Sequence, residues 1–150
     1  MREIHVMEVD FPKSRFYRSL MTGLFVGIID TLVCLLFNLV YRQSTGFSPS
    51  AIINVATIIF FVNLLFPLIG IVYNGFLGAA RKGEIAFMVV FILVTVLCCW
   101  LAEGVRRTDN GLENAEFRTL LVGMVVVMGA SAAFLLPYLY HSRSFEKHVV

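Results

Sequence analysis

The chain has 150 residues, of which 59% are hydrophobic and 15% charged, and its mean hydropathy is +0.85. Soluble domains are about half apolar and about a quarter charged, so this composition indicates an integral membrane protein with little room for a soluble domain. The net charge of +2 is too small to suggest nucleic acid as a partner.

The sequence predicts an all-α fold, a polytopic membrane protein with four transmembrane helices. Each of four apolar runs is long enough to cross a bilayer at about 1.5 Å per residue, and lipid offers no partner for a free backbone N–H. The second helix is expected to start at Ser48 and Pro49, because Ser is a favoured N-cap and Pro fits the first turn. The predicted spans cover about residues 20–41, 49–74, 85–102 and 119–140.

The positive charges predict that both termini lie in the cytoplasm. A cytoplasmic segment, 1–18, would precede the transmembrane domain, 19–142, and a cytoplasmic tail, 143–150, would follow it. In this orientation the inner segments carry more Lys and Arg than the outer loops, as the positive-inside rule requires. The inner cations are Arg2, Lys13, Arg15, Arg18, Arg81, Lys82, Arg143 and Lys147, and the outer ones are Arg42, Arg106, Arg107 and Arg118.

The two halves of the chain show a faint internal similarity. The segment Thr31–Cys34 matches Thr95–Cys98, and Arg42 matches Arg106, with the same offset of 64 residues (95 − 31). Two interpretations are open. The halves are either two similar helical hairpins, related by an axis along the membrane normal, or a chance likeness between apolar sequences.

The first predicted helix carries a stripe of small and polar residues. At helical spacing, one face presents Gly23, Gly27, Asp30, Thr31, Cys34 and Asn38. A matching face of the second predicted helix presents Asn63, Pro67, Gly70 and Asn74. We expect the helices to pack through Gly23, Gly27, Pro67 and Gly70, where small residues let backbones approach closely. The predicted intramembrane polar site consists of Asp30, Thr31, Asn38 and Asn63.

Asp30 is the central question of this sequence, because it lies near the middle of its span. A carboxylate there costs about 2.5–3.5 kcal/mol, and no Lys or Arg is predicted at that depth. Desolvation disfavours the charged form, so Asp30 is expected to be protonated for much of the time and to face Asn63 rather than lipid. Its role is either to hold helices together by hydrogen bonds or to couple a proton, cation or substrate.

No motif predicts catalysis, a cofactor or a metal. The three histidines, His5, His141 and His148, lie in the terminal segments without the carboxylate or cysteine spacing of a metal site. The sequence contains no nucleophile elbow, Walker loop or Rossmann fingerprint. We therefore expect a protein without enzymatic activity.

The first helix and the loop after it resemble the GtrA-like family of small four-span membrane proteins. The likeness is carried by Gly27–Val33, Phe37–Arg42, Gly46–Pro49 and the helix that contains Asn54 and Asn63. This resemblance covers about a third of the chain. It implies four spans in two similar halves, a bacterial-type inner (plasma) membrane, and a role in moving lipid-linked sugars across that membrane.

Two functional classes are open. The first is a non-enzymatic accessory or scaffold subunit of a larger inner-membrane complex, which explains the small-residue faces and the lack of catalytic groups. The second is a small transporter or flippase, of a proton-coupled or lipid-linked-sugar type, which explains the midplane Asp30. We prefer the first. The expected partners are membrane lipids and other integral membrane subunits, or further copies of the same chain.

Overall fold

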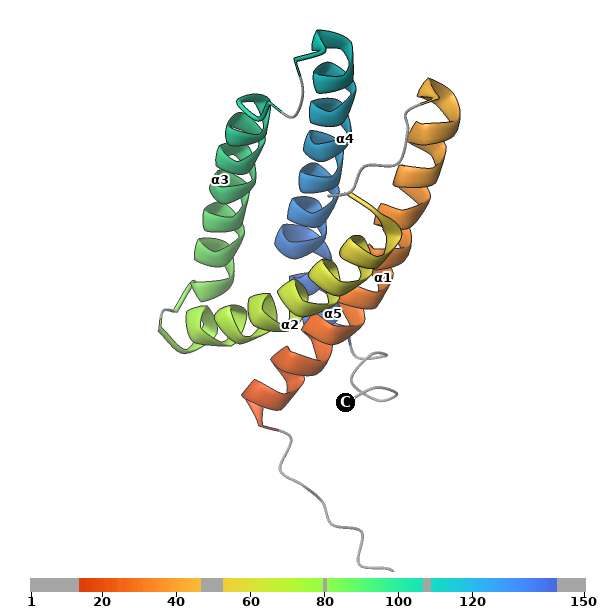
Figure 1. The fold of residues 1–150 in the computed structure, drawn as a ribbon. Coiled ribbons are helices and arrows are strands. Elements are labelled where there is room, and N and C mark those ends of the chain that lie inside the picture. The colour runs from red at the N-terminus through yellow and green to blue at the C-terminus, as the bar shows by residue number, and fades with distance from the viewer. Residues whose placement is uncertain (1–13, 47–52, 80, 107–108, 143–150) are drawn as a thin grey trace, which may run out of the picture.

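The computed structural model describes residues 14–46, 53–79, 81–106 and 109–142, and these residues form helices without any strand. The helices are α1 (Arg15–Thr45), α2 (Val55–Ala79), α3 (Gly83–Glu103), α4 (Gly111–Ala130), the π-helix η1 (Ser131–Leu135) and α5 (Leu136–His141) (Figure 1). Because α4, η1 and α5 follow one another without a break, they act as one long rod.

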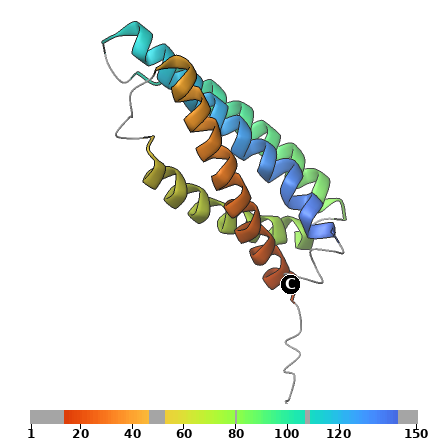
Figure 2. The same ribbon diagram turned by 90° about the vertical axis from the view of Figure 1, so that its right-hand side faces the viewer.

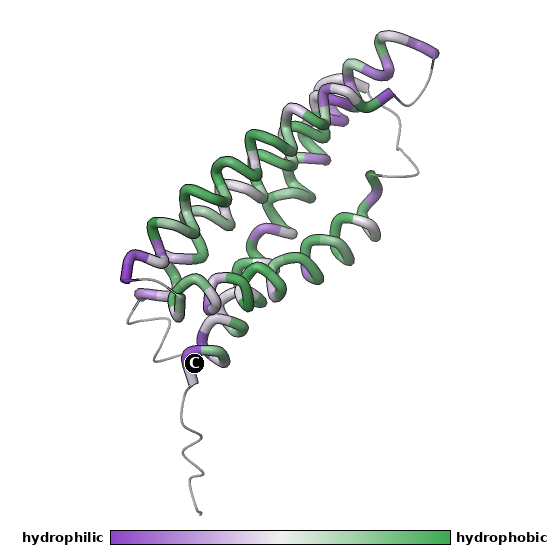
Figure 3. The backbone as a smooth tube through the Cα atoms, turned by 90° about the vertical axis from the view of Figure 1, so that its left-hand side faces the viewer, coloured by the Kyte–Doolittle hydropathy of each residue, from purple (hydrophilic) through white to green (hydrophobic). Residues whose placement is uncertain are grey.

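Four rods are therefore long and apolar enough to cross a membrane: α1, α2, α3 and the Gly111–His141 rod. This result confirms the predicted all-α architecture with four transmembrane helices, and the chain is a multi-pass membrane protein. Hydrophobic residues fill the middle of the rods, and hydrophilic residues gather toward their ends (Figure 3).

The helix bounds differ from the predicted spans. α1 is longer at both ends than 20–41, because the Ser14 hydroxyl caps its start and Gly46, with φ of 68°, ends it in the left-handed conformation. α2 begins at Val55, later than predicted, where the Asn54 side chain accepts a hydrogen bond of 2.9 Å from the Thr57 amide. The predicted cap at Ser48 and Pro49 lies outside the described residues, as do 1–13 and the tail 143–150.

The rods alternate in direction, so that the start of α1 and the end of α5 meet at one end of the bundle (Figures 1 and 2). The Arg18 guanidinium donates to the carbonyl oxygen of Tyr140 there, and the start of α3 lies close enough for Glu84 to pair with His141. We call this the Arg18 end. The first and the last described residues thus lie on the same side of the bundle, as an even number of crossings requires.

α2 lies obliquely across α1, whereas α3 and α4 run side by side (Figure 1). The crossing is close because glycines form it. A Cβ atom on Gly23 would lie 2.6 Å from the Phe66 carbonyl oxygen, and one on Gly70 would lie 2.5 Å from the Ser19 carbonyl oxygen. Gly27 rests against the Phe66 side chain at the same crossing. The two backbones are therefore in direct contact, which any side chain at Gly23 or Gly70 would prevent.

We predict that Gly70→Ala destabilises the protein, because the new methyl group meets backbone that cannot move aside. Overpacking of this kind costs about 1–3 kcal/mol. Gly75→Ala in the same helix is the matched control, since a Cβ atom there meets nothing within 4 Å. Thermal unfolding in detergent micelles measures both. A Gly70→Ala protein that unfolds at the same temperature as the Gly75→Ala protein would contradict the backbone contact.

Candidate functional site

Asp30 is completely buried and is hydrogen-bonded within its own chain. Its Oδ1 atom accepts a hydrogen bond of 2.6 Å from the Ser131 hydroxyl, and the Cys34 thiol donates to Oδ2 at 3.7 Å. No Lys or Arg side chain pairs with Asp30 among the residues that the structure describes. The carboxyl group is thus held by neutral donors, one from α1 itself and one from the π-helix η1.

Ser131 reaches Asp30 from the first position of the π-helix η1. Pro137 lies two residues after η1 and has no N–H, so the Ala133 carbonyl oxygen lacks its usual helical donor. The chain instead widens into a π turn, in which the Leu136 amide bonds to the Ser131 carbonyl oxygen. Ala132 and Ala133 in that turn are each 1% exposed and leave room for α1 to approach. π segments are rare and often lie at functional sites.

Asn63 does not contact Asp30, which corrects the predicted pair. Its Nδ2 atom donates instead to the Thr31 hydroxyl at 2.8 Å and to the Ile59 carbonyl oxygen at 2.9 Å. Thr31 in turn donates to the Gly27 carbonyl oxygen at 2.7 Å. Consecutive residues of an α-helix point about 100° apart, so when Thr31 faces α2, Asp30 faces η1. The predicted single polar site is therefore two separate ties, Thr31–Asn63 and Asp30–Ser131.

The other predicted polar and packing residues lie along the same helices. Asn38 is 4% exposed, and its Nδ2 atom has no partner among the described residues. Pro67 is half-buried inside α2, four residues after Asn63, so it leaves the Asn63 carbonyl without the usual helical donor. Neither residue contributes a hydrogen bond to Asp30.

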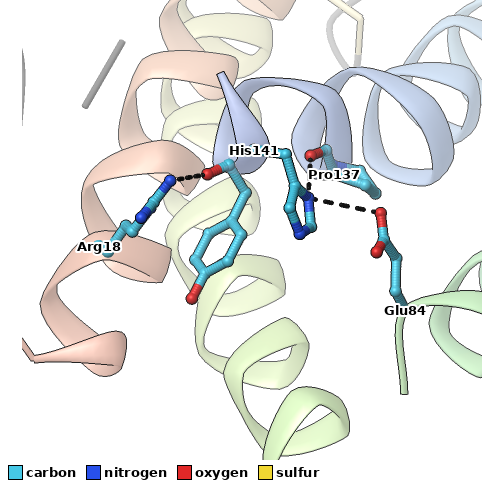
Figure 4. Close-up of polar contacts among 5 residues, drawn as sticks. Arg18, Glu84, Pro137 and His141 are labelled. Atoms are coloured by element: carbon cyan, nitrogen blue, oxygen red, sulfur yellow. Dashed lines mark hydrogen bonds and ion pairs between the residues drawn. The ribbon is translucent and has the colours of Figure 1, made fainter. Parts of the chain in front are cut away.

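The sequence analysis missed Ser131 and the cluster at the Arg18 end. The Arg18 guanidinium lies 4.7 Å from the centroid of the Tyr140 ring, and that ring packs edge-on against Tyr73 with 5.1 Å between centroids. The His141 Nδ1 atom lies 3.0 Å from the Pro137 carbonyl oxygen and 3.5 Å from Glu84 (Figure 4). One signal for Ser131 was present, because it is the only polar side chain in the small-residue patch Gly129–Ala133.

The chemistry available at Asp30 is hydrogen bonding and proton exchange. Within the described part of the chain, no three His, Cys, Asp or Glu side chains gather in a way that could hold a metal ion. Neither Ser131 nor Cys34 has a histidine beside it to act as a general base, since His141 lies at the Arg18 end with Glu84. The site offers no arrangement typical of nucleophilic catalysis.

Comparison of the chain with protein-family models, with curated proteins and with solved structures finds no match. The resemblance to the GtrA-like family therefore stays a prediction. The geometry around Asp30 and at the Arg18 end is the basis for a functional proposal.

We predict that Ser131→Ala destabilises the bundle by about 0.6–1.7 kcal/mol, which spans the average and the largest values for a hydrogen bond between membrane helices. The reason is that Asp30 Oδ1 loses its donor while staying buried. Thr119→Ala is the control, because the Thr119 hydroxyl is exposed and bonds only to Ala115 in its own helix. Unfolding in micelles measures the difference, and equal stability of the two variants would contradict the Asp30–Ser131 bond.

Double-mutant cycles are expected to separate the two polar ties. Asn63→Leu and Thr31→Val should show a coupling energy of about 0.6 kcal/mol, because they share one hydrogen bond. Asn63→Leu and Asp30→Asn should combine additively, since these residues do not bond. Coupling of Asn63 to Asp30 rather than to Thr31 would restore the pair predicted from the sequence.

Proposed function

We propose that this chain is a non-enzymatic accessory or scaffold subunit of a larger membrane complex, in which Asp30 holds the helices together. One observation carries the proposal. Asp30 is 0% exposed, and its two carboxyl oxygens are engaged by Ser131 and Cys34 of the same chain. A carboxyl group used in this way stabilises a bundle and has no free oxygen pointing at a ligand.

The surface of α3 supports an accessory role. α3 contacts α4 along one side, and most of its apolar side chains face outward, including Val89, Leu93, Val96 and Trp100. Lipid can cover such a surface, and so can the helix of another integral membrane subunit or of a second copy. A subunit that exposes most of one helix to its surroundings is well suited to join an assembly.

The proposed setting is a bacterial-type inner membrane with both termini in the cytoplasm. The structure brings the start of α1, the turn before α3 and the end of α5 to the Arg18 end. Arg15, Arg18, Arg81 and Lys82 lie at that end, and the positive-inside rule favours the cytoplasm for it.

A small transporter or flippase, proton-coupled or for lipid-linked sugars, is the competing function. It is favoured by the exposure of Ser131, which is only half-buried and lines a hollow on the outer face of η1. Ser131 therefore lies between the buried Asp30 and the surface of the bundle. A π turn followed by Pro137 is also a place where a helix can change its pairing.

Asp30→Asn tests the two functions against each other. An Asn side chain still accepts a hydrogen bond from Ser131, so a scaffold should keep its fold and its co-purifying subunits, whereas Asp30→Leu should lose about 1–3 kcal/mol of stability. The measurement is purification of the tagged full-length protein in mild detergent, followed by native gel and mass spectrometry. Asp109→Asn, at an exposed position before α4, is the matched control.

Stoichiometric co-purification with other integral subunits, unchanged by Asp30→Asn, would support the scaffold. A lone homo-oligomer would contradict it. If that oligomer takes up protons in proteoliposomes and Asp30→Asn abolishes the uptake without unfolding the protein, Asp30 couples transport.

A further inference from the structure

Two neighbouring hollows lie along the outer face of η1 and α5. They measure about 410 Å³ and about 580 Å³, and both are lined by Phe134 and Tyr138. The first lies at the Arg18 end, where Glu84 of α3 and His141 of α5 line it. The second ends at Ala130 and Ser131, beside the Asp30 tie. We call the two hollows together the lateral groove.

The lateral groove is polar at one end and apolar along the rest of its length. Glu84, His141 and Ser142 line its mouth, where the helices end. From there the walls are formed by Phe134, Leu135 and Ala130, and Ser131 is the one polar side chain at the deep end. The groove thus has the polarity of one leaflet of a bilayer, from headgroup level to midplane.

The length of the groove matches one leaflet. Ten residues separate His141 from Ser131 (141 − 131), which corresponds to about 15 Å at about 1.5 Å per residue. The hydrocarbon core of a bilayer is about 30 Å thick, so one leaflet contributes about 15 Å. If a lipid headgroup is bound at Glu84, its acyl chain would therefore extend along the groove as far as Ser131.

The mouth of the groove favours a cation. His141 is held beside Glu84, because its Nδ1 atom lies 3.0 Å from the Pro137 carbonyl oxygen. Glu84 adds a carboxylate whose side chain is 36% exposed. Tyr138, which is 72% exposed, adds an aromatic face that can attract an ammonium group.

The same end of the bundle also offers partners for a phosphate. Arg81 and Lys82 are exposed in the turn that precedes α3, three and two residues before Glu84. A headgroup with an ammonium for Glu84 and a phosphate for these cations is zwitterionic. An anionic phospholipid without an amine can place its phosphate near Arg81 and Lys82, but it brings no cation to the Glu84 carboxylate.

We propose that the lateral groove binds one amine-bearing phospholipid, of the phosphatidylethanolamine class, from the leaflet at the Arg18 end. Its ammonium group contacts Glu84 and the Tyr138 ring, and one acyl chain lies along Phe134 and Leu135 toward Ser131. A scaffold and a transporter would both carry this site, so the proposal does not rest on either function.

Native mass spectrometry of the full-length protein in mild detergent tests the site. The protein is titrated with phosphatidylethanolamine and, separately, with phosphatidylglycerol of identical acyl chains. We expect preferential binding of phosphatidylethanolamine, and a loss of about fivefold in that binding for Glu84→Gln, the upper range for an exposed ion pair. Glu103→Gln, an exposed carboxylate at the far end of α3, should bind both lipids as the unchanged protein does.

A second variant tests the acyl-chain part of the groove. Ala130→Leu fills the end of the groove beside Ser131 and should weaken the binding of both lipids. Ala56→Leu, at an exposed position on α2, should leave the binding of both unchanged. Equal binding of the two lipids, or no effect of Glu84→Gln, would overturn the headgroup assignment. If the unchanged protein binds neither lipid, the proposal is wrong, and the groove is left for a helix of another protein or of a second copy.

Discussion

The hydrocarbon layer offers no water, so every polar group that α1 carries into it needs a partner within the protein. Asp30 is the most demanding of these groups, because a lone carboxylate at this depth is expensive to bury. Ser131 and Cys34 meet that demand, and Thr31 meets Asn63 on the neighbouring side of the same helix. These hydrogen bonds hold α2 and η1 against α1.

α1 contacts both α2 and the fourth rod, and it uses a different side for each contact. The glycine side accepts the backbone of α2 at the Gly23–Gly70 crossing, and Thr31 holds α2 further along. The Asp30 side faces η1, whose small residues Ala132 and Ala133 permit close contact. The remaining sides carry exposed apolar residues such as Leu32 and Leu36. A single helix thus ties both halves of the chain together, while α3 contacts α1 little and stays at the edge.

The π-helix and Pro137 link the structural role of Asp30 to the surface. Ser131, the first residue of η1, donates to Asp30 and also lines the lateral groove outside. At the Arg18 end, α5 is held by the contacts of Arg18 with Tyr140 and of Glu84 with His141. η1 and α5 therefore contribute to the helix packing, to the hydrogen bonding of Asp30 and to the proposed lipid site.

The number and type of the elements could be read from the chain alone, because four apolar runs in a membrane leave only helices as a solution. The small-residue faces of α1 and α2 were also visible, since helical periodicity assigns residues to a face. Periodicity does not give the angle at which two helices cross or how each is rotated against its neighbours. For that reason the sequence predicted Asn63 as the partner of Asp30. In the structure α2 crosses α1 obliquely, and Asn63 hydrogen-bonds to Thr31. The residue that bonds to Asp30, Ser131, lies 101 residues away in the fourth rod, and hydropathy patterns do not show which residues of two distant helices meet.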